Sequence, residues 1–179
     1  MDVKNKNGNQ ILDGQSSDEE TKEIENKIVD SNEDMITPSS RRDVRSLAFH
    51  LVYAMEQLDY KVSLESIVDN FRRGFKVNIS SDSFAIILSS EVISRRDELD
   101  TQMKPILRNW KLERLSCCTK LILRMALCEL QQPDAIPNII INEAIELAKG
   151  FAENDAYKFV NGVLDEFVKK VGLKNDKST

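Results

Sequence analysis

Turn-forming residues are scarce in this sequence. It has six glycines and four prolines among 179 residues, whereas collagen-like, low-complexity and many-turned all-β chains need far more of them. No apolar run reaches the roughly 20 residues that cross a bilayer. The first thirty residues also lack the cationic and then apolar layout of a signal peptide. We therefore expect a helical, cytoplasmic protein without a membrane-embedded part.

Residues for catalysis or metal binding are also few. The three cysteines, Cys117, Cys118 and Cys128, are odd in number and two are adjacent, which argues against a disulfide framework and suits a reducing compartment. They lack C-x-x-C spacing and a histidine partner, so we expect no metal site. The single histidine, His50, falls within an expected helix and is interpreted as a half-buried structural residue. Because glycine-rich phosphate loops are absent as well, the residues favour a binding protein over an enzyme, with no cofactor.

Charge is unevenly distributed along the chain. Residues 1–40 carry ten acidic side chains against four lysines, a net charge of −6, so the remainder carries +1 of the total of −5. Their apolar residues are too sparse to bury a core. We predict an acidic disordered tail over residues 1–39, a helical domain over 40–173 and a disordered C-terminus over 174–179. Such a tail could screen a nucleic-acid site or simply keep the protein in solution.

The helical domain is predicted to begin directly after Ser40. Ser40 and Asp43 have the spacing of a capping box, in which each side chain satisfies a backbone N–H at the start of a helix. Apolar residues then recur with a period of 3.6 residues through Leu58, which predicts a long amphipathic helix.

Five further amphipathic stretches follow. They are residues 64–72, 81–109, 112–131, 138–149 and 154–171. The second of these is expected to part into two helices near residues 96–100, with Pro105 marking a kink or a break. Gly74 and Gly150 have the positions of C-terminal caps. Six or seven helices with short connections and no strand candidate predict an all-α fold of about seven helices in two small packed bundles.

Three arginines occupy the first turn and a half of the first helix. Arg41 and Arg45 lie one turn apart and can follow a phosphate backbone, while Arg42 projects about 100° around the axis. Cations at a helix N-terminus oppose the helix dipole by roughly 0.3–1 kcal/mol each, so a bound anion would explain their placement. A merely solvated basic turn explains three arginines equally well.

The last helix carries a second stripe beside its apolar one. Asp155, Phe159 and Gly162 follow at i, i+4 and i+7, and Lys158 flanks them. If this stripe faces water, Phe159 offers a stacking platform for an unpaired base, worth about 1–3 kcal/mol, with Lys158 beside it for phosphate. If the stripe faces another helix, Phe159 belongs to the core, which its hydrophobicity alone favours.

Several segments resemble the NusB family of bacterial transcription antitermination factors. The C-terminal stretches INEAIELAK (141–149) and KFVNGVLD (158–165) resemble the family's signature. LILRMALCEL (121–130) is similar to its fifth helix, and RRDVR (41–45) to its arginine-rich start. The resemblance extends over about residues 40–171.

The resemblance implies a seven-helix, two-bundle fold without catalytic activity. Members of the family pair with the ribosomal protein that doubles as NusE. Together they bind the boxA element of nascent RNA in the transcription elongation complex and support antitermination on ribosomal RNA operons. The residues implied to contact RNA lie at the starts of the first and last helices. They are Arg41, Arg42, Arg45, Asp155, Lys158 and Phe159.

Two features depart from the family pattern. Asp43 stands where many members have a further basic residue, and the acidic tail of residues 1–39 is additional. Both imply a weaker affinity for RNA without the ribosomal partner. A helical protein–protein adaptor without direct RNA contact is the alternative function.

Overall fold

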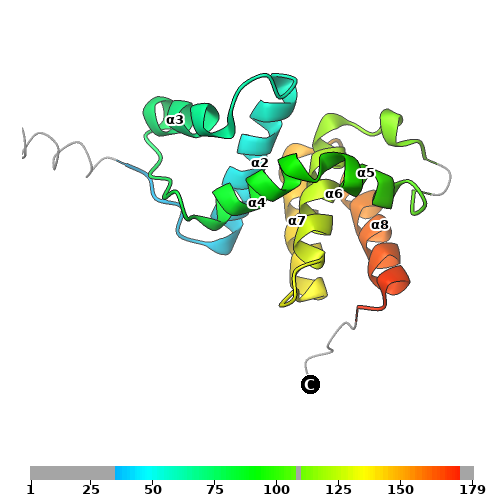
Figure 1. The fold of residues 1–179 in the computed structure, drawn as a ribbon. Helices are drawn as coiled ribbons and strands as arrows, with labels where there is room; N and C mark the ends of the chain where they lie inside the picture. Colours follow the sequence, from blue (N-terminus) through cyan, green and yellow to red (C-terminus); the bar gives the residue numbers. More distant parts are fainter. Residues whose placement is uncertain (1–34, 108–109, 174–179) are drawn as a thin grey trace, which may run out of the picture. The chain divides into compact units, whose positions relative to one another are not determined.

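The structure, a computed structural model, describes residues 35–107 and 110–173 (Figure 1). The chain divides into two units, residues 1–36 and 37–179, and every described helix lies in the second unit. The predictions of disorder over residues 1–34 and 174–179 lie outside the described residues.

The described residues form seven α-helices and one 3₁₀ turn, which confirms the prediction of an all-α fold. Helices α2, α3 and α4 pack as one small bundle, and α5 to α8 as a second. The elements are α2 (Arg41–Gln57), α3 (Leu64–Phe75), α4 (Phe84–Ser94), α5 (Arg96–Met103), η1 (Leu112–Arg114), α6 (Cys117–Leu130), α7 (Pro137–Phe151) and α8 (Ala156–Val171).

Serine side chains start four of these helices. The predicted capping box is present at α2, where Ser40 Oγ accepts the Asp43 N–H at 3.0 Å and the Asp43 carboxylate accepts the Ser40 N–H at 3.1 Å. Hydrogen bonding by Ser40 also lowers the pKa of Asp43. Ser63, Ser83 and Ser116 cap α3, α4 and α6 in the same way, each accepting the N–H of the residue three positions on. Each cap satisfies a backbone donor that the helix itself leaves free.

The two predicted glycine caps are wrong. Helix α3 continues through Gly74 and is ended by Lys76, which takes the left-handed conformation at φ 50°. Helix α7 continues through Gly150 to Phe151, whose ring stacks on Phe49 of α2 at 4.7 Å between centroids. This aromatic contact gives the last turn of α7 a packing partner that local sequence does not reveal.

Two other predicted boundaries shift by a few residues. The break between α4 and α5 falls at Arg95, just before the predicted segment 96–100. The stretch expected as one helix over 112–131 consists of η1 and α6, because the Ser116 cap begins a new helix. His50 is exposed rather than half-buried, with its ring edge-on to Phe151.

Helix α6 lies at the centre of the fold and is buried all round. Eleven of its 14 residues are buried, and it packs against α2, α4, α5, α7 and α8. Among the buried residues are two charged ones, Arg124 and Glu129. Buried charges are tolerated only when paired, so α6 carries ionic contacts as well as apolar ones to its neighbours.

Candidate nucleic-acid interface

Arg45 points into the protein rather than toward solvent. The residue is 8% exposed, and its guanidinium binds the Glu129 carboxylate of α6, with Nε at 2.9 and 3.0 Å and Nη2 at 2.6 Å. Its Nη1 donates to the Arg41 carbonyl at 3.4 Å. The guanidinium therefore ties the start of α2 to the end of α6.

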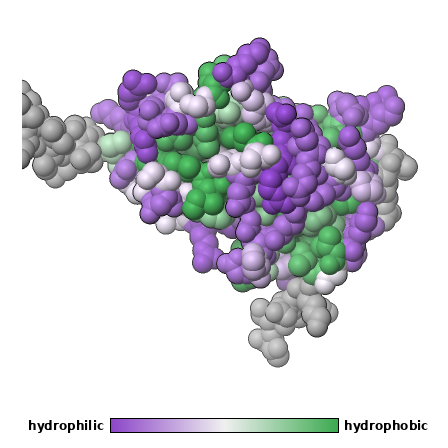
Figure 2. All heavy atoms as spheres, in the orientation of Figure 1, coloured by the Kyte–Doolittle hydropathy of each residue, from purple (hydrophilic) through white to green (hydrophobic). Residues whose placement is uncertain are grey.

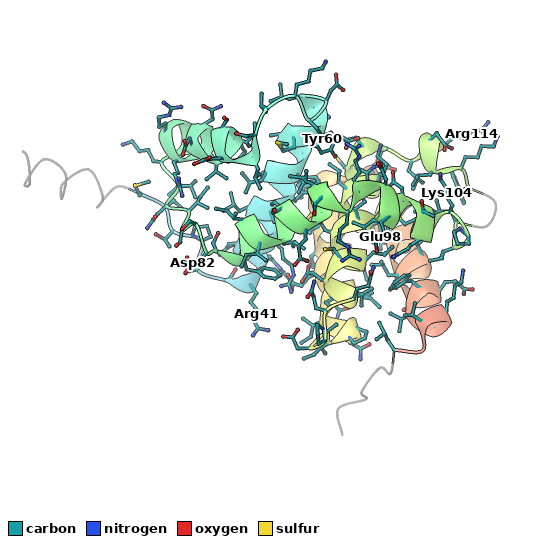
Figure 3. The ribbon with its side chains drawn as sticks, viewed as in Figure 1. Arg41, Tyr60, Asp82, Glu98, Lys104 and Arg114 are labelled. Atoms are coloured by element: carbon teal, nitrogen blue, oxygen red, sulfur yellow. The ribbon has the colours of Figure 1, made fainter. Side chains whose placement is uncertain are left out.

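Arg41 and Arg42 are exposed at the same helix start. Arg41 projects from the first turn of α2 away from the neighbouring helices (Figure 3). The Arg42 side chain is 59% exposed and lies 3.7 Å from a carboxylate oxygen of both Glu143 and Glu146 on α7. Exposed pairs of this kind contribute little and exchange readily with other anions. Both side chains thus remain accessible to a phosphate.

An apolar cleft of about 420 Å³ adjoins Arg41. Phe84 at the start of α4 and Ile136 and Ile139 at the start of α7 line it together with the Arg45–Glu129 pair. Phe84 and Ile87 of α4 are exposed, and apolar atoms reach the surface over the start of α4 (Figure 2). The arginines therefore border an apolar wall.

At the start of α8, Asp155 and Lys158 form an exposed ion pair. Asp155 adopts the left-handed conformation at φ 65° and makes no side-chain cap to the helix. Its carboxylate instead accepts from Lys158 Nζ at 2.8 Å, which raises the pKa of Lys158. Lys158 is exposed to solvent, but the Asp155 carboxylate already offsets part of its positive charge.

The Phe159 side chain is neither fully buried in the core nor fully exposed for stacking with a base. Its half-buried ring meets Trp110 edge-to-face, with centroids 5.5 Å apart and planes at 63°. Both rings border a hollow of about 360 Å³, which Gly162 and Glu166 also line. Trp110 was not among the predicted site residues, although a lone tryptophan in a polar connection between helices is a signal that the sequence offers.

The two groups of predicted residues lie on either side of Lys149 of α7, the helix that Arg42 contacts and α8 packs against. Within the described part of the chain, no hydrogen bond or ion pair joins the arginines of α2 to Asp155, Lys158 or Phe159. Lys149 of α7 lies between them: its Nζ is 2.7 Å from Glu146 and 5.6 Å from the Tyr157 ring, while Lys158 Nζ is 5.7 Å from the same ring. A cationic row of Arg42, Lys149 and Lys158 therefore crosses three helices, and Lys149 is a member that sequence reasoning missed.

Comparison with known proteins identifies the family. A family profile described as "NusB family" matches residues 42–169. The chain belongs to the NusB family. It is 38% identical over 130 residues to transcription antitermination protein NusB of Macrococcus caseolyticus, covering 73% of this chain and 97% of that protein. It is also 38% identical over 135 residues to the protein of the same name from Geotalea uraniireducens, covering 72% and 93%.

Solved structures agree with the NusB assignment. A structure of T. maritima NusB matches with a TM-score of 0.64 and 28% identity, covering 74% of this chain and 92% of that one. A crystal structure of antitermination factors NusB and NusE in complex with dsRNA matches with a TM-score of 0.62 and 21% identity, covering 73% and 96%. The second likeness concerns the NusB fold alone.

The described part of this NusB-family chain contains neither a cluster of metal-ligating side chains nor a helix that could span a membrane. Among residues 35–107 and 110–173, no three or more His, Cys, Asp or Glu side chains gather as metal ligands would. None of the helices that the structure describes has the length and apolar character needed to cross a membrane.

Proposed function

We propose that this NusB-family protein is a cytoplasmic transcription antitermination factor that binds boxA-type RNA together with NusE, in support of ribosomal RNA transcription, and that it catalyses no reaction. The name shared by its relatives and the NusB–NusE–dsRNA complex among its structural neighbours support this function. The observation that carries it is that Arg41 and Arg42 are both exposed at the start of α2, where the two carboxylate contacts of Arg42 are long, at 3.7 Å each.

The geometry favours distinct roles for the predicted residues. Arg41 and Arg42 would contact phosphates, and Lys149 and Lys158 would continue the contact across α7 and α8. Arg45 would act as a positioning residue, because its guanidinium is engaged by Glu129 and fixes the helix that carries the other two arginines.

RNA affinity of the protein alone is expected to be low. Arg42, Lys149 and Lys158 each face a carboxylate at 3.7 Å or less, and each of these contacts must be exchanged for a phosphate. Each phosphate contact therefore adds little to the free energy of RNA binding. A second protein that supplies RNA contacts of its own is important for this reason.

The test is an RNA titration at several salt concentrations, with labelled single-stranded boxA-type RNA, with and without NusE. Replacing Arg41 and Arg42 together by alanine should weaken binding and flatten the log–log salt dependence by about one to two units. Arg73→Ala on α3, an exposed arginine outside this surface, is the matched control. Unchanged affinity and slope in the double variant would contradict the proposal, and binding of NusE without any contribution from RNA would favour the adaptor function.

A further inference from the structure

The single histidine of the chain lies on the same stripe of α2 as Arg42. Arg42, Ser46 and His50 follow at i, i+4 and i+8, so their side chains lie one above the other along the helix. At a rise of about 1.5 Å per residue, the first and the last are about 12 Å apart along the axis. One RNA strand covers such a span with a few nucleotides. The stripe therefore leads from an arginine of the proposed RNA surface to the imidazole.

One side of the His50 ring is packed and the other side faces solvent. The ring meets Phe151 of α7 edge-to-face at 5.0 Å between centroids and Phe49 at 5.8 Å, whereas the residue as a whole is exposed. Within the residues that the structure describes, neither ring nitrogen has a hydrogen bond or an ion pair. The two apolar rings thus hold the imidazole in place, and its nitrogens are accessible to a ligand.

The charges around His50 leave the ring open to an anion. The carboxylates on the elements packed here already have partners of their own; they are Asp43 and Glu56 on α2, Glu143 and Glu146 on α7, and Glu153 in the turn before α8. Helix α6 contacts another side of α2 through Arg45 and Glu56, so its charges do not face the ring. The other titratable side chains of the two helices are Arg41, Arg42 and Tyr53 on α2 and Lys149 on α7.

The charge of His50 depends on pH in the neutral range. Burial of one side of the ring disfavours the imidazolium form and lowers the pKa of His50, so the free protein carries a neutral ring at pH 7. A phosphate beside the ring would favour the imidazolium and raise the pKa. By linkage, protonation then favours the phosphate contact by the same factor. RNA binding would take up a proton, and affinity would increase as the pH falls from the pKa of the complex to that of the free protein.

We propose that His50 is a pH-dependent member of the RNA-binding surface, which in its imidazolium form contacts a phosphate of the strand that Arg42 holds. The proposal rests on the proposed RNA-binding function and adds a dependence of affinity on pH to it. At neutral pH the cationic row consists of Arg42, Lys149 and Lys158, and in mild acid His50 joins it as a fourth cation. The protein therefore binds RNA more tightly as the pH falls.

The test exploits the fact that His50 is the only histidine of the chain. One imidazole signal in the NMR spectrum of the full-length protein reports its protonation with and without RNA. Ordinary carboxylates stay ionised and lysines stay protonated between about pH 5.5 and about pH 8, so a change in affinity within this window reports on the same ring. The anisotropy of labelled single-stranded boxA-type RNA, at constant ionic strength and with and without NusE, measures the affinity.

We expect the affinity to rise about three- to tenfold from about pH 8 to about pH 5.5, and the pKa of His50 to rise on RNA binding. The two changes must agree, because a rise of one full pKa unit corresponds to a tenfold change in affinity. His50→Gln should bind at every pH as weakly as the wild type does at about pH 8, and His50→Arg should bind tightly at every pH. Adding Asn70→His on α3 to the His50→Gln variant is the matched control and should not restore the pH dependence.

Four results would overturn the inference. RNA binding that depends on Arg41 and Arg42 but not on pH, with an unchanged pKa of His50, removes the histidine contact and keeps the proposed function. An equal pH dependence in His50→Gln assigns the titration to another group. A pKa of His50 that rises with NusE alone and not with RNA assigns the ring to the protein partner. Absence of RNA binding by the wild type at every pH, even with NusE, removes both proposals.

Discussion

At the residue scale, Arg41 and Arg45 are the same residue type one helical turn apart in opposite environments. Arg41 is exposed at the start of α2, whereas Arg45 is buried against Glu129. Nothing in the local sequence separates them, because the partner of Arg45 lies 84 positions away on α6. Their roles differ because their neighbours differ, and substitutions can show the difference.

Arg45→Ala should destabilise the protein by about 3–5 kcal/mol, because it leaves the Glu129 carboxylate buried without its partner. Arg41→Ala should change the free energy of unfolding by no more than about 0.5 kcal/mol, since it removes an exposed side chain. Urea unfolding of the two variants measures both values. The double variant Arg45→Met with Glu129→Leu removes both charges of the buried pair and should restore most of the lost stability. If Arg45→Ala proved as stable as Arg41→Ala, the buried pair would be dispensable.

Asp155 is expected to limit RNA binding. Its carboxylate holds Lys158 Nζ at 2.8 Å and adds negative charge to the proposed surface. Asp155→Asn removes the charge, and asparagine tolerates the left-handed conformation that this position takes. We expect a severalfold rise in RNA affinity, with a salt slope steeper by up to about one unit as Lys158 becomes free to contact phosphate. Asp165→Asn, on the same helix but paired with Asn161, should leave the affinity unchanged. A loss of affinity in Asp155→Asn would instead indicate that the carboxylate itself contacts RNA.

At the element scale, an ionic cluster holds α2, α5 and α6 together. Arg124 of α6 donates to both Asp100 oxygens at 2.7 and 2.8 Å and to Glu56 at 3.0 Å. The Glu56 carboxylate also forms an ion pair with Lys120 Nζ at 3.1 Å and accepts a hydrogen bond from the Tyr60 hydroxyl. Figure 3 shows Tyr60 near the end of α2. Since α6 is buried all round, the cluster fixes the orientation of α6 more specifically than apolar contacts alone.

The cluster should make stability depend on pH in acid. Burial opposes ionisation of Glu56, but the hydrogen bonds from Tyr60 and Lys120 and the charge of Arg124 together keep its pKa below the ordinary 4.5. A carboxylate with a lowered pKa stabilises the fold above its unfolded pKa, and this stability is lost as the pH falls through the folded value. Glu56→Gln should cost about 1–3 kcal/mol at neutral pH, and the gap to the wild type should narrow between about pH 5 and about pH 3. Urea unfolding at each pH measures the gap; a constant gap would show that ionisation of Glu56 contributes nothing.

The sequence predicts elements well where the signal is local. Ser40 and Asp43 define the start of α2 because the capping box involves only neighbours. Gly74 and Gly150 mislead because the ends of α3 and α7 depend on the left-handed Lys76 and on packing of Phe151 against Phe49. The periodicity also shows one apolar face of α6, whereas burial on all sides follows from how five other helices surround it.

At the scale of the whole molecule, the candidate interface extends over three helices. The resemblance to a family supplies Arg41, Lys158 and Phe159, but Lys149 joins them only because α7, which packs against α8, also contacts α2 through Arg42. Trp110 joins the site because the turn after α5 carries it to the face of α8. Lys149 carries no motif that marks it, so a site predicted from motifs alone omits residues that only the packing of helices brings to the surface in question.

The uneven charge of the chain yields the broadest prediction. Residues 1–34 hold ten acidic side chains and four lysines, so their removal changes the net charge from −5 to +1. A net negative charge slows the approach of RNA through long-range repulsion, which salt screens over about 10 Å at 0.1 M. The truncated protein should therefore bind RNA more tightly at low salt and equally at high salt, as measured by titration across salt concentrations.

A full-length variant with six of the ten acidic residues replaced by their amides also has a net charge of +1 and should match the truncated protein. If truncation strengthens binding equally at every salt concentration, charge is not the cause, because repulsion between distant charges cannot persist through screening.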